Sequence, residues 1–318
     1  MSDKPYQPAH IETPPLFVWP LQPLKILRFL TIDIMVPWGL FWIAVAFMLW
    51  HFLTPDPDTM KSFSVTWLGL LWLRNAFVLS LVAGGLHWYL YIKRSQNTDT
   101  KYSKHWLAKD NKRFLWGDQV LDNMTFSLLS GVTVWTLYEA ATYWWYANSY
   151  VSALSIAESP IYFLICLWGV FFWSTLHFYF NHRLLHTKWL YDAAHVRHHL
   201  NVVTGPWIGI SMHPIEHIIY FSIFLLWWIV PVHPVIIIVT GLFQGVSPAV
   251  SHSGFDYLSI GKRVRIPAGD NFHNLHHRYF RVNYGNSMVP MDKVFDSWNN
   301  GSDADMEKMK ARFKKEAG

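Results

Sequence analysis

The chain has 318 residues, of which 52% are hydrophobic, 18% are aromatic and only 15% are charged. Soluble domains usually carry about a quarter charged residues, so this composition excludes an ordinary water-soluble protein and favours a single integral membrane domain. The formal net charge of +5 is modest. No basic and aromatic residues are arranged as in a nucleic-acid surface, and we expect no nucleic-acid partner.

The N-terminal stretch MSDKPYQPAHIETPPLFVWP is polar and rich in proline. It lacks the charged start and short apolar core of a cleavable signal peptide, and we expect none. The chain has one cysteine, Cys166. An internal disulfide and a cysteine-based zinc or iron–sulfur site are therefore excluded.

Four apolar segments each approach the roughly 20 residues that an α-helix needs to cross the hydrocarbon layer. A fifth apolar run, residues 215–243, is broken by the sequence PVHP, which predicts a hairpin of two short helices that enters the membrane and returns. The sequence therefore predicts an all-α, polytopic membrane bundle of about four spanning helices plus this hairpin, with a histidine-rich metal-binding cap. The four spanning segments are residues 31–53, 65–92, 121–146 and 161–180.

The distribution of basic residues predicts the orientation in the membrane. The loop of residues 93–113 carries seven Lys or Arg residues against two Asp. The positive-inside rule places this loop, and with it the N-terminus, in the cytoplasm. Counting the predicted crossings from there returns the chain to the cytoplasm just before His182. We therefore expect the histidine-rich cap and both termini on the cytoplasmic side.

Histidines are crowded into three clusters in the second half of the chain. The stretch HRLLHTKWLYDAAHVRHH, residues 182–199, contains five of the 17 histidines, and DNFHNLHH repeats its H-x-x-H-H spacing. Histidines three or four residues apart lie on one face of a helix, so each cluster aims two or three imidazoles in one direction. The predicted metal ligands are His182, His186, His195, His198, His199, His252, His273, His276 and His277, with His213 as a further candidate.

The number of clustered histidines exceeds what one ion can use. Imidazole is a common ligand of divalent first-row metals, and one such ion takes three or four protein ligands. We therefore predict two metal ions held close together. His217 is a weaker candidate than His213, and His177 lies about 140° around a helix from His182. No metal binding is expected of the isolated histidines His10, His51, His87, His105 and His233.

The order HRLLH, HVRHH, HPIE, HSG and HNLHH resembles the fatty acid hydroxylase/sterol desaturase superfamily. The resemblance implies a non-haem di-iron centre at the cytosolic membrane face that uses O2 and two electrons to hydroxylate or desaturate a lipid. It implies that the eight clustered histidines and His252 are ligands of the metal ions. It also suggests three parts, namely a tail with two membrane helices at 1–117, a catalytic domain at 118–298 and a polar tail at 299–318.

The chemistry of the metal agrees with this resemblance. Unactivated C–H bonds call for a metal–oxygen oxidant, and iron suits both imidazole ligands and O2 activation, whereas zinc has no redox chemistry. No HPGG motif of a fused cytochrome b5 domain is present. We therefore expect electrons from a separate cytochrome b5, ferredoxin or reductase. The HRLLH and HPIE forms resemble the sterol desaturase branch, which points to a sterol-like or long-chain lipid.

Carboxylates beside the histidines are candidates for orienting their ring N–H groups, namely Asp192, Glu216 and Asp270. Two other functions stay open. A zinc-dependent membrane hydrolase is disfavoured because HRLLH lacks the glutamate of H-E-x-x-H, which supplies the general base. A metal transporter would line its path with intramembrane histidines, whereas these clusters fall beyond the predicted helix ends.

Overall fold

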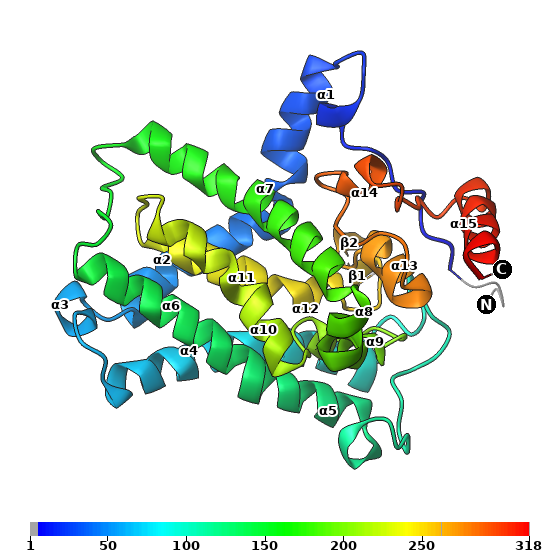
Figure 1. Ribbon diagram of the computed structural model, residues 1–318, viewed down its shortest axis with the longest axis horizontal. Coiled ribbons are helices and arrows are strands. Elements are labelled where there is room, and N and C mark those ends of the chain that lie inside the picture. Colours follow the sequence, from blue (N-terminus) through cyan, green and yellow to red (C-terminus); the bar gives the residue numbers. More distant parts are fainter. Residues whose placement is uncertain (1–5, 262, 318) are drawn as a thin grey trace.

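The computed structural model describes residues 6–261 and 263–317 and is mainly helical (Figure 1). The longer helices are α2 (Leu40–Leu53), α4 (Val65–His87), α5 (Gln119–Thr125), α6 (Val132–Ala147), α7 (Pro160–Leu185), α10 (Pro214–Phe221), α11 (Val235–Gly245), α13 (Asn271–Tyr279) and α15 (Asp303–Ala317). The shorter ones are α1 (Pro23–Arg28), α3 (Pro57–Met60), α8 (Lys188–Leu190), α9 (Val196–His199), α12 (Ser247–Ser251) and α14 (Met291–Val294).

Three helical segments of the described chain are long and apolar enough to cross a membrane, namely Pro23–Leu53, Val65–Ile92 and Pro160–Leu185. They contain three of the four predicted spans. The fourth, residues 121–146, is also helical, because α5 and α6 are joined by the π-helical η6 (Phe126–Gly131). This helix carries Asp122 and Glu139 and is not among the three. By length and composition three segments therefore qualify, and residues 121–146 form a further long helix beside them.

The predicted hairpin is present, and it lies inside the bundle. Residues 215–243 form α10, the 3-10 segment η9 (Ser222–Trp228) and α11, with a break that contains Pro231 and Pro234. Within α11 every residue except Phe243 is buried. Gly241 and Gly245 let it approach α6 closely, since a Cβ at either position would lie 2.6 Å from the Trp135 ring. Small residues at a helix contact allow this kind of close packing.

A buried ion pair joins α4 to α6. Arg74 Nη2 lies 2.5 Å from Glu139 Oε1, and both side chains are almost fully buried. The amide of Asn75 donates to Glu139 Oε2, and the hydroxyl of Tyr143 donates to Glu139 Oε1. Each charge is therefore compensated and hydrogen-bonded, which is the condition for placing charged groups in an apolar interior.

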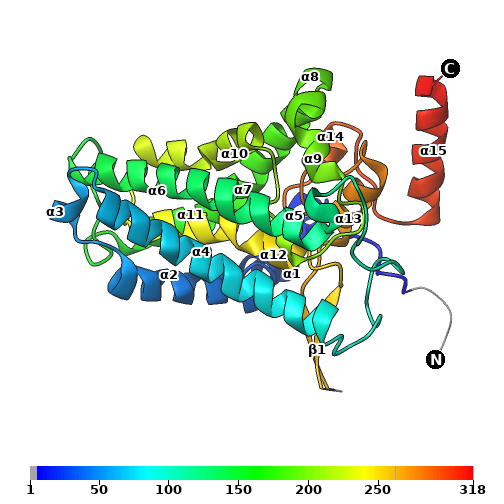
Figure 2. The ribbon, with the colours of Figure 1, turned by 90° about the horizontal axis from the view of Figure 1, so that it is seen from below.

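A two-stranded antiparallel hairpin, β1 (Tyr257–Ile260) and β2 (Val264–Pro267), adds a small β element that the all-α prediction did not include. Four-residue strands give too short an alternation to stand out in sequence. The long helices lie side by side along the longest axis, and α8, α9, α13 and the C-terminal α15 gather at one end (Figures 1 and 2). The histidine clusters therefore lie at one end of the helical bundle.

Candidate metal centre

Four separate segments of the chain supply the clustered histidines. His182 and His186 lie at the C-terminal end of α7, and His195 ends the π-helical η7 (Tyr191–His195), which leads directly into α9. His252 follows α12, and α13 carries the last cluster. The carboxylate of Asp270 caps α13 by accepting from the backbone N–H of Phe272, at 2.9 Å, and of His273. This N-cap fixes where the last cluster begins.

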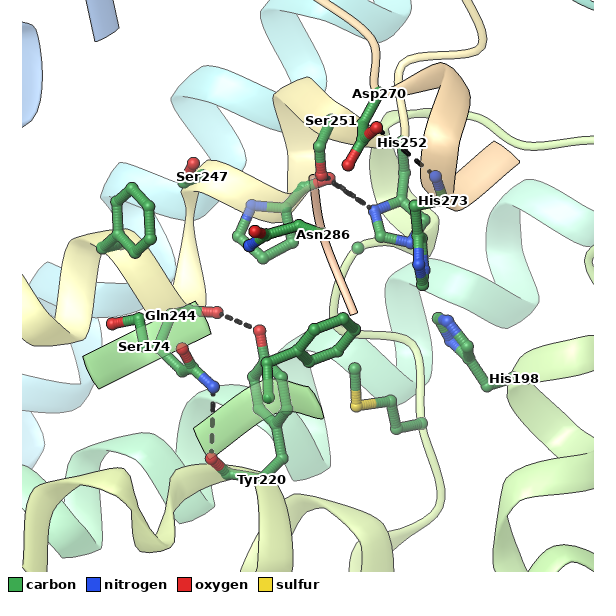
Figure 3. Close-up of a pocket in the computed structure, with 15 residues that line it drawn as sticks. Ser174, His198, Tyr220, Gln244, Ser247, Ser251, His252, Asp270, His273 and Asn286 are labelled. Atoms are coloured by element: carbon green, nitrogen blue, oxygen red, sulfur yellow. Dashed lines mark hydrogen bonds between the residues drawn. The ribbon is translucent and has the colours of Figure 1, made fainter. Parts of the chain in front are cut away.

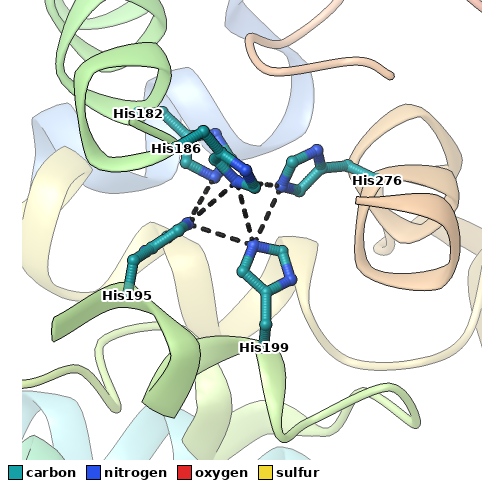
Figure 4. A group of neighbouring side chains, drawn as sticks. All are labelled: His182, His186, His195, His199 and His276. Carbon is teal, nitrogen blue, oxygen red and sulfur yellow. Dashed lines mark hydrogen bonds between the residues drawn. The ribbon is translucent and has the colours of Figure 1, made fainter. Parts of the chain in front are cut away.

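The nine principal predicted ligands come together in two groups. Within each group the ligating atoms all lie within 4.8 Å of one another. Neighbours in sequence go to different groups, because adjacent residues on a helix point in different directions. The five-histidine group contains His182, His186, His195, His199 and His276 (Figure 4), and the four-histidine group contains His198, His252, His273 and His277.

In the five-histidine group the Nε2 atoms converge on one point (Figure 4). His195 Nε2 lies 3.0 Å from the Nε2 of His182 and 3.0 Å from that of His199. His186 Nε2 lies 3.1 Å from the Nε2 atoms of His195 and of His276. Nitrogens bound to one metal at about 2.0–2.1 Å lie about 3 Å apart when their bonds are at right angles, so this spacing fits a shared ion.

Backbone carbonyls fix which ring nitrogen carries the proton. His182 Nδ1 lies 2.5 Å from the Tyr284 carbonyl, and His276 Nδ1 lies 2.7 Å from that of Val282. A carbonyl oxygen only accepts, so each Nδ1 donates and each Nε2 keeps its lone pair. In the four-histidine group His198 Nδ1 faces the Ser211 carbonyl in the same way, at 3.2 Å. Such contacts are typical of metal-binding histidines.

Burial keeps the imidazoles uncharged. It lowers the pKa of His198 to about 4 and the pKa of His252 to about 3. Both rings are therefore neutral near pH 7 and can offer lone pairs. In the four-histidine group His252 Nε2, His273 Nδ1 and both ring nitrogens of His277 are buried without a hydrogen-bond partner. Buried unpaired polar atoms are costly, and a bound cation would compensate these.

His213 is outside both groups. It precedes α10, and its Nδ1 accepts the backbone N–H of Ile215 at 3.2 Å. His217 is also outside, since its Nδ1 meets the Ser130 hydroxyl and its Nε2 faces the Ile210 carbonyl, each at 2.9 Å. The HPIE motif therefore supplies neither group with a histidine. The other histidines outside both groups are His10, His51, His87, His105, His177 and His233.

The carboxylates beside the clusters have three different roles. Glu216 Oε1 lies 2.8 Å from His195 Nδ1, and both side chains are buried. Asp270 contacts α13 as its N-cap, as described above. Asp192 is exposed at the surface. Of the three carboxylates, Glu216 is therefore the one that contacts the ring of a clustered histidine and can orient it.

Residues 167–297 match the fatty acid hydroxylase family. This chain contains a fatty acid hydroxylase domain. The match spans both histidine groups, from His182 to His277, and confirms the resemblance seen in the histidine motifs.

Two relatives of the fatty acid hydroxylase domain have the names of different enzymes. The very-long-chain aldehyde decarbonylase CER1 of Arabidopsis thaliana is 25% identical over 91% of this chain and 44% of its own length. The Delta(7)-sterol 5(6)-desaturase ERG3 of Saccharomyces cerevisiae is 31% identical over 42% of this chain and 36% of its own length. The chain thus spans less than half the length of these relatives. No solved structure gives a significant match.

A cavity of about 140 Å³ lies inside the fatty acid hydroxylase domain, against the four-histidine group. His198, His252 and His273 line one side, and Ser174 and Gln244 lie on the opposite side (Figure 3). None of the five-histidine group lines it. The cavity wall and the carbonyls of Val282 and Tyr284 gave no signal in the sequence, because backbone acceptors and lining residues have no motif.

Proposed function

We propose that the protein is an O2-dependent di-iron membrane oxidoreductase that hydroxylates or desaturates a lipid. The observation that carries the proposal is the convergence of nine histidines into two groups, within a fatty acid hydroxylase domain and beside an internal cavity. The five-histidine group would hold one iron and the four-histidine group the other. Histidines in two tight groups support two ions, since one ion cannot use nine ligands.

Iron is the metal we propose because both groups contain histidines alone. Bound iron would supply the redox chemistry that activates O2 for attack on an unactivated C–H bond. The backbone carbonyls hold the rings in the tautomer that leaves Nε2 free, and the apolar helices exclude water from the site. We propose that electrons come from a separate partner, a cytochrome b5, a ferredoxin or a reductase.

The substrate has two candidates. A sterol-like lipid is suggested by the histidine motifs and by the match to a sterol desaturase. A long-chain aldehyde is favoured by the extent of the other match, because the aldehyde decarbonylase aligns over 91% of this chain and the sterol desaturase over 42%. Both are lipids that reach the enzyme from a membrane.

Metal analysis together with product analysis tests the proposal. Purified protein should contain two irons per chain. It should convert a sterol or a long-chain aldehyde only when O2 and a reducing partner are supplied, with products identified by mass spectrometry. One zinc per chain, with turnover that needs neither O2 nor a reducing partner, would instead show a zinc hydrolase. Weakly held, exchangeable ions without turnover would show a transporter.

A further inference from the structure

The cavity beside the four-histidine group has a polar end, formed around Ser174 of α7. The Ser174 side chain is buried, and its hydroxyl has no hydrogen-bond partner. The next residue, Thr175, satisfies its own hydroxyl by donating to the Phe171 carbonyl of the same helix, at 3.0 Å. Serine commonly makes that intrahelical bond too, so an unpaired hydroxyl beside a cavity points to a missing partner.

Three other polar residues at this end make hydrogen bonds within the protein. The amide of Gln244 donates to the Tyr220 carbonyl, and the Tyr220 hydroxyl donates to the Gln244 carbonyl at 2.9 Å. Asn286 donates to Thr175 Oγ1 at 3.2 Å. Among these residues, the Ser174 hydroxyl is the one buried side-chain group that has no hydrogen-bond partner.

The charged residues that line the cavity limit which chemical groups can bind in it. No Lys or Arg is present among the described residues that line the cavity, and Asp270 is its one acidic group. On the Ser174 side, away from the proposed iron, a lipid carboxylate or phosphate would find no cation, and a buried unpaired anion is very costly. A hydroxyl or a carbonyl oxygen carries no charge and needs only one hydrogen bond, which Ser174 can supply.

The size of the cavity limits how far that oxygen lies from the reacting carbon. At about 140 Å³ the cavity resembles in volume an engineered cavity of about 150 Å³ that binds benzene. The histidines and Ser174 lie on opposite sides of it (Figure 3). A ligand that touches both sides therefore has only a few carbons between its oxygen and the atom nearest the histidines.

We propose that this cavity binds the reacting section of a lipid with a neutral hydroxyl or carbonyl oxygen a few carbons from the reacting carbon, and that Ser174 holds that oxygen. The inference rests on the proposed function for the meaning of the reacting carbon. The claim that Ser174 binds a neutral oxygen in this cavity does not depend on the proposed function.

Two small probes of matched shape test the inference. 4-Fluorophenol and 4-fluorotoluene differ by a hydroxyl in place of a methyl group, and 19F NMR reports the binding of each to the iron-loaded protein in lipid nanodiscs. Ser174→Ala should weaken the binding of 4-fluorophenol about 2- to 10-fold, the effect of one hydrogen bond, and leave that of 4-fluorotoluene unchanged. Comparing variant with wild type cancels the unequal partition of the probes into lipid.

Ser80→Ala is the matched control, since Ser80 is a half-buried serine of α4 that does not line the cavity. It should leave both affinities unchanged. The thermal unfolding midpoint of Ser174→Ala without a probe should equal or exceed that of the wild type, because the lost hydroxyl has no partner. Equal weakening of both probes, no change for either, or a lowered midpoint would each overturn the inference. Failure of the proposed function would give a different result. Iron or turnover would be missing, while Ser174→Ala would still weaken the binding of 4-fluorophenol and not that of 4-fluorotoluene.

Discussion

The buried carboxylate of Glu216 lies 2.8 Å from His195 Nδ1, on the side of the ring away from the other histidines. Its second oxygen, Oε2, is buried without a partner. This contact sets the His195 ring so that Nε2 faces His182, His186 and His199. It is the one contact between a carboxylate and a ring nitrogen of either group among the described residues.

Replacing that carboxylate should loosen the metal without removing the site. Glu216→Gln keeps the side-chain shape but replaces the carboxyl group by an amide, whose NH2 can turn toward Nδ1 and oppose its role as donor. We expect metal affinity to fall about 10-fold or more, measured as metal retained after dialysis against a graded chelator. Asp192→Asn removes an exposed charge nearby and is the control. Equal retention in Glu216→Gln and wild type would show that the contact does not support the ligand.

Replacing one ligand in each group should show the loss of metal from each group separately. His276→Ala removes a nitrogen from the five-histidine group and His198→Ala removes one from the four-histidine group. Each variant should lose metal and turnover together, because no spare imidazole replaces the lost one. Metal per chain measured by mass spectrometry checks this, with His105→Ala and His233→Ala as controls. If His198→Ala kept two metals and formed normal product, the assignment of both groups would be wrong.

We expect His213 to stabilise the start of α10 rather than to bind metal. Its Nδ1 accepts the N–H of Ile215 at the start of α10, and it is in neither group. His213→Ala should therefore keep both metals and lower the free energy of unfolding by about 1 kcal/mol, as is usual for a lost N-cap. Metal analysis and thermal unfolding of the same sample measure both effects. Loss of one metal would instead make His213 a ligand.

The ion pair between α4 and α6 should be sensitive to single changes and tolerant of a double one. Arg74→Met leaves Glu139 buried without its counter-charge, which should lower the free energy of unfolding by about 3–5 kcal/mol. Adding Glu139→Gln should restore most of that loss, because no uncompensated charge remains. Unfolding of the wild type, Arg74→Met and the double variant in one detergent gives the comparison. A double variant as unstable as Arg74→Met would contradict this explanation.

The predicted orientation can be tested at Thr187, an exposed residue just after α7. With Cys166 replaced by alanine, a cysteine at Thr187 should react with an impermeant label only from the cytoplasmic side. A cysteine at Ser152, in the exposed loop before α7, should react only from the opposite side. The reverse pattern would mean that a predicted crossing is miscounted.

Much of the site could be predicted from sequence because its residues repeat at helical spacing. His195, His198 and His199 lie on one short helical turn, and their spacing alone predicted that they act together. The division into two groups could not be predicted, since it depends on how α7, α9 and α13 cross in space. His198 and His199 are neighbours in the chain yet belong to different groups.

The fold shows the same limit. Apolar segments predicted four spans, three of which qualify by length and composition, and also the broken hairpin, because length and proline positions are local features. The burial of α11 inside the bundle depends on its close contact with Trp135, which lies about a hundred residues earlier. The fourth predicted segment is helical as well, but the pairing of its Glu139 with Arg74 of α4 could not be predicted, because it depends on how the two helices pack.

The place of α13 near the end of the chain has a consequence for how the enzyme is made. His276 belongs to one group, and His273 and His277 belong to the other. A ribosome that has delivered α7 and α9 to the membrane has therefore completed neither metal site. On the proposed function, the iron of the four-histidine group must enter after residue 277 has been synthesised and α13 has docked, because α13 supplies half of that group. A nascent or truncated chain that ends before α13 would keep four histidines of the five-histidine group but only two of the four-histidine group.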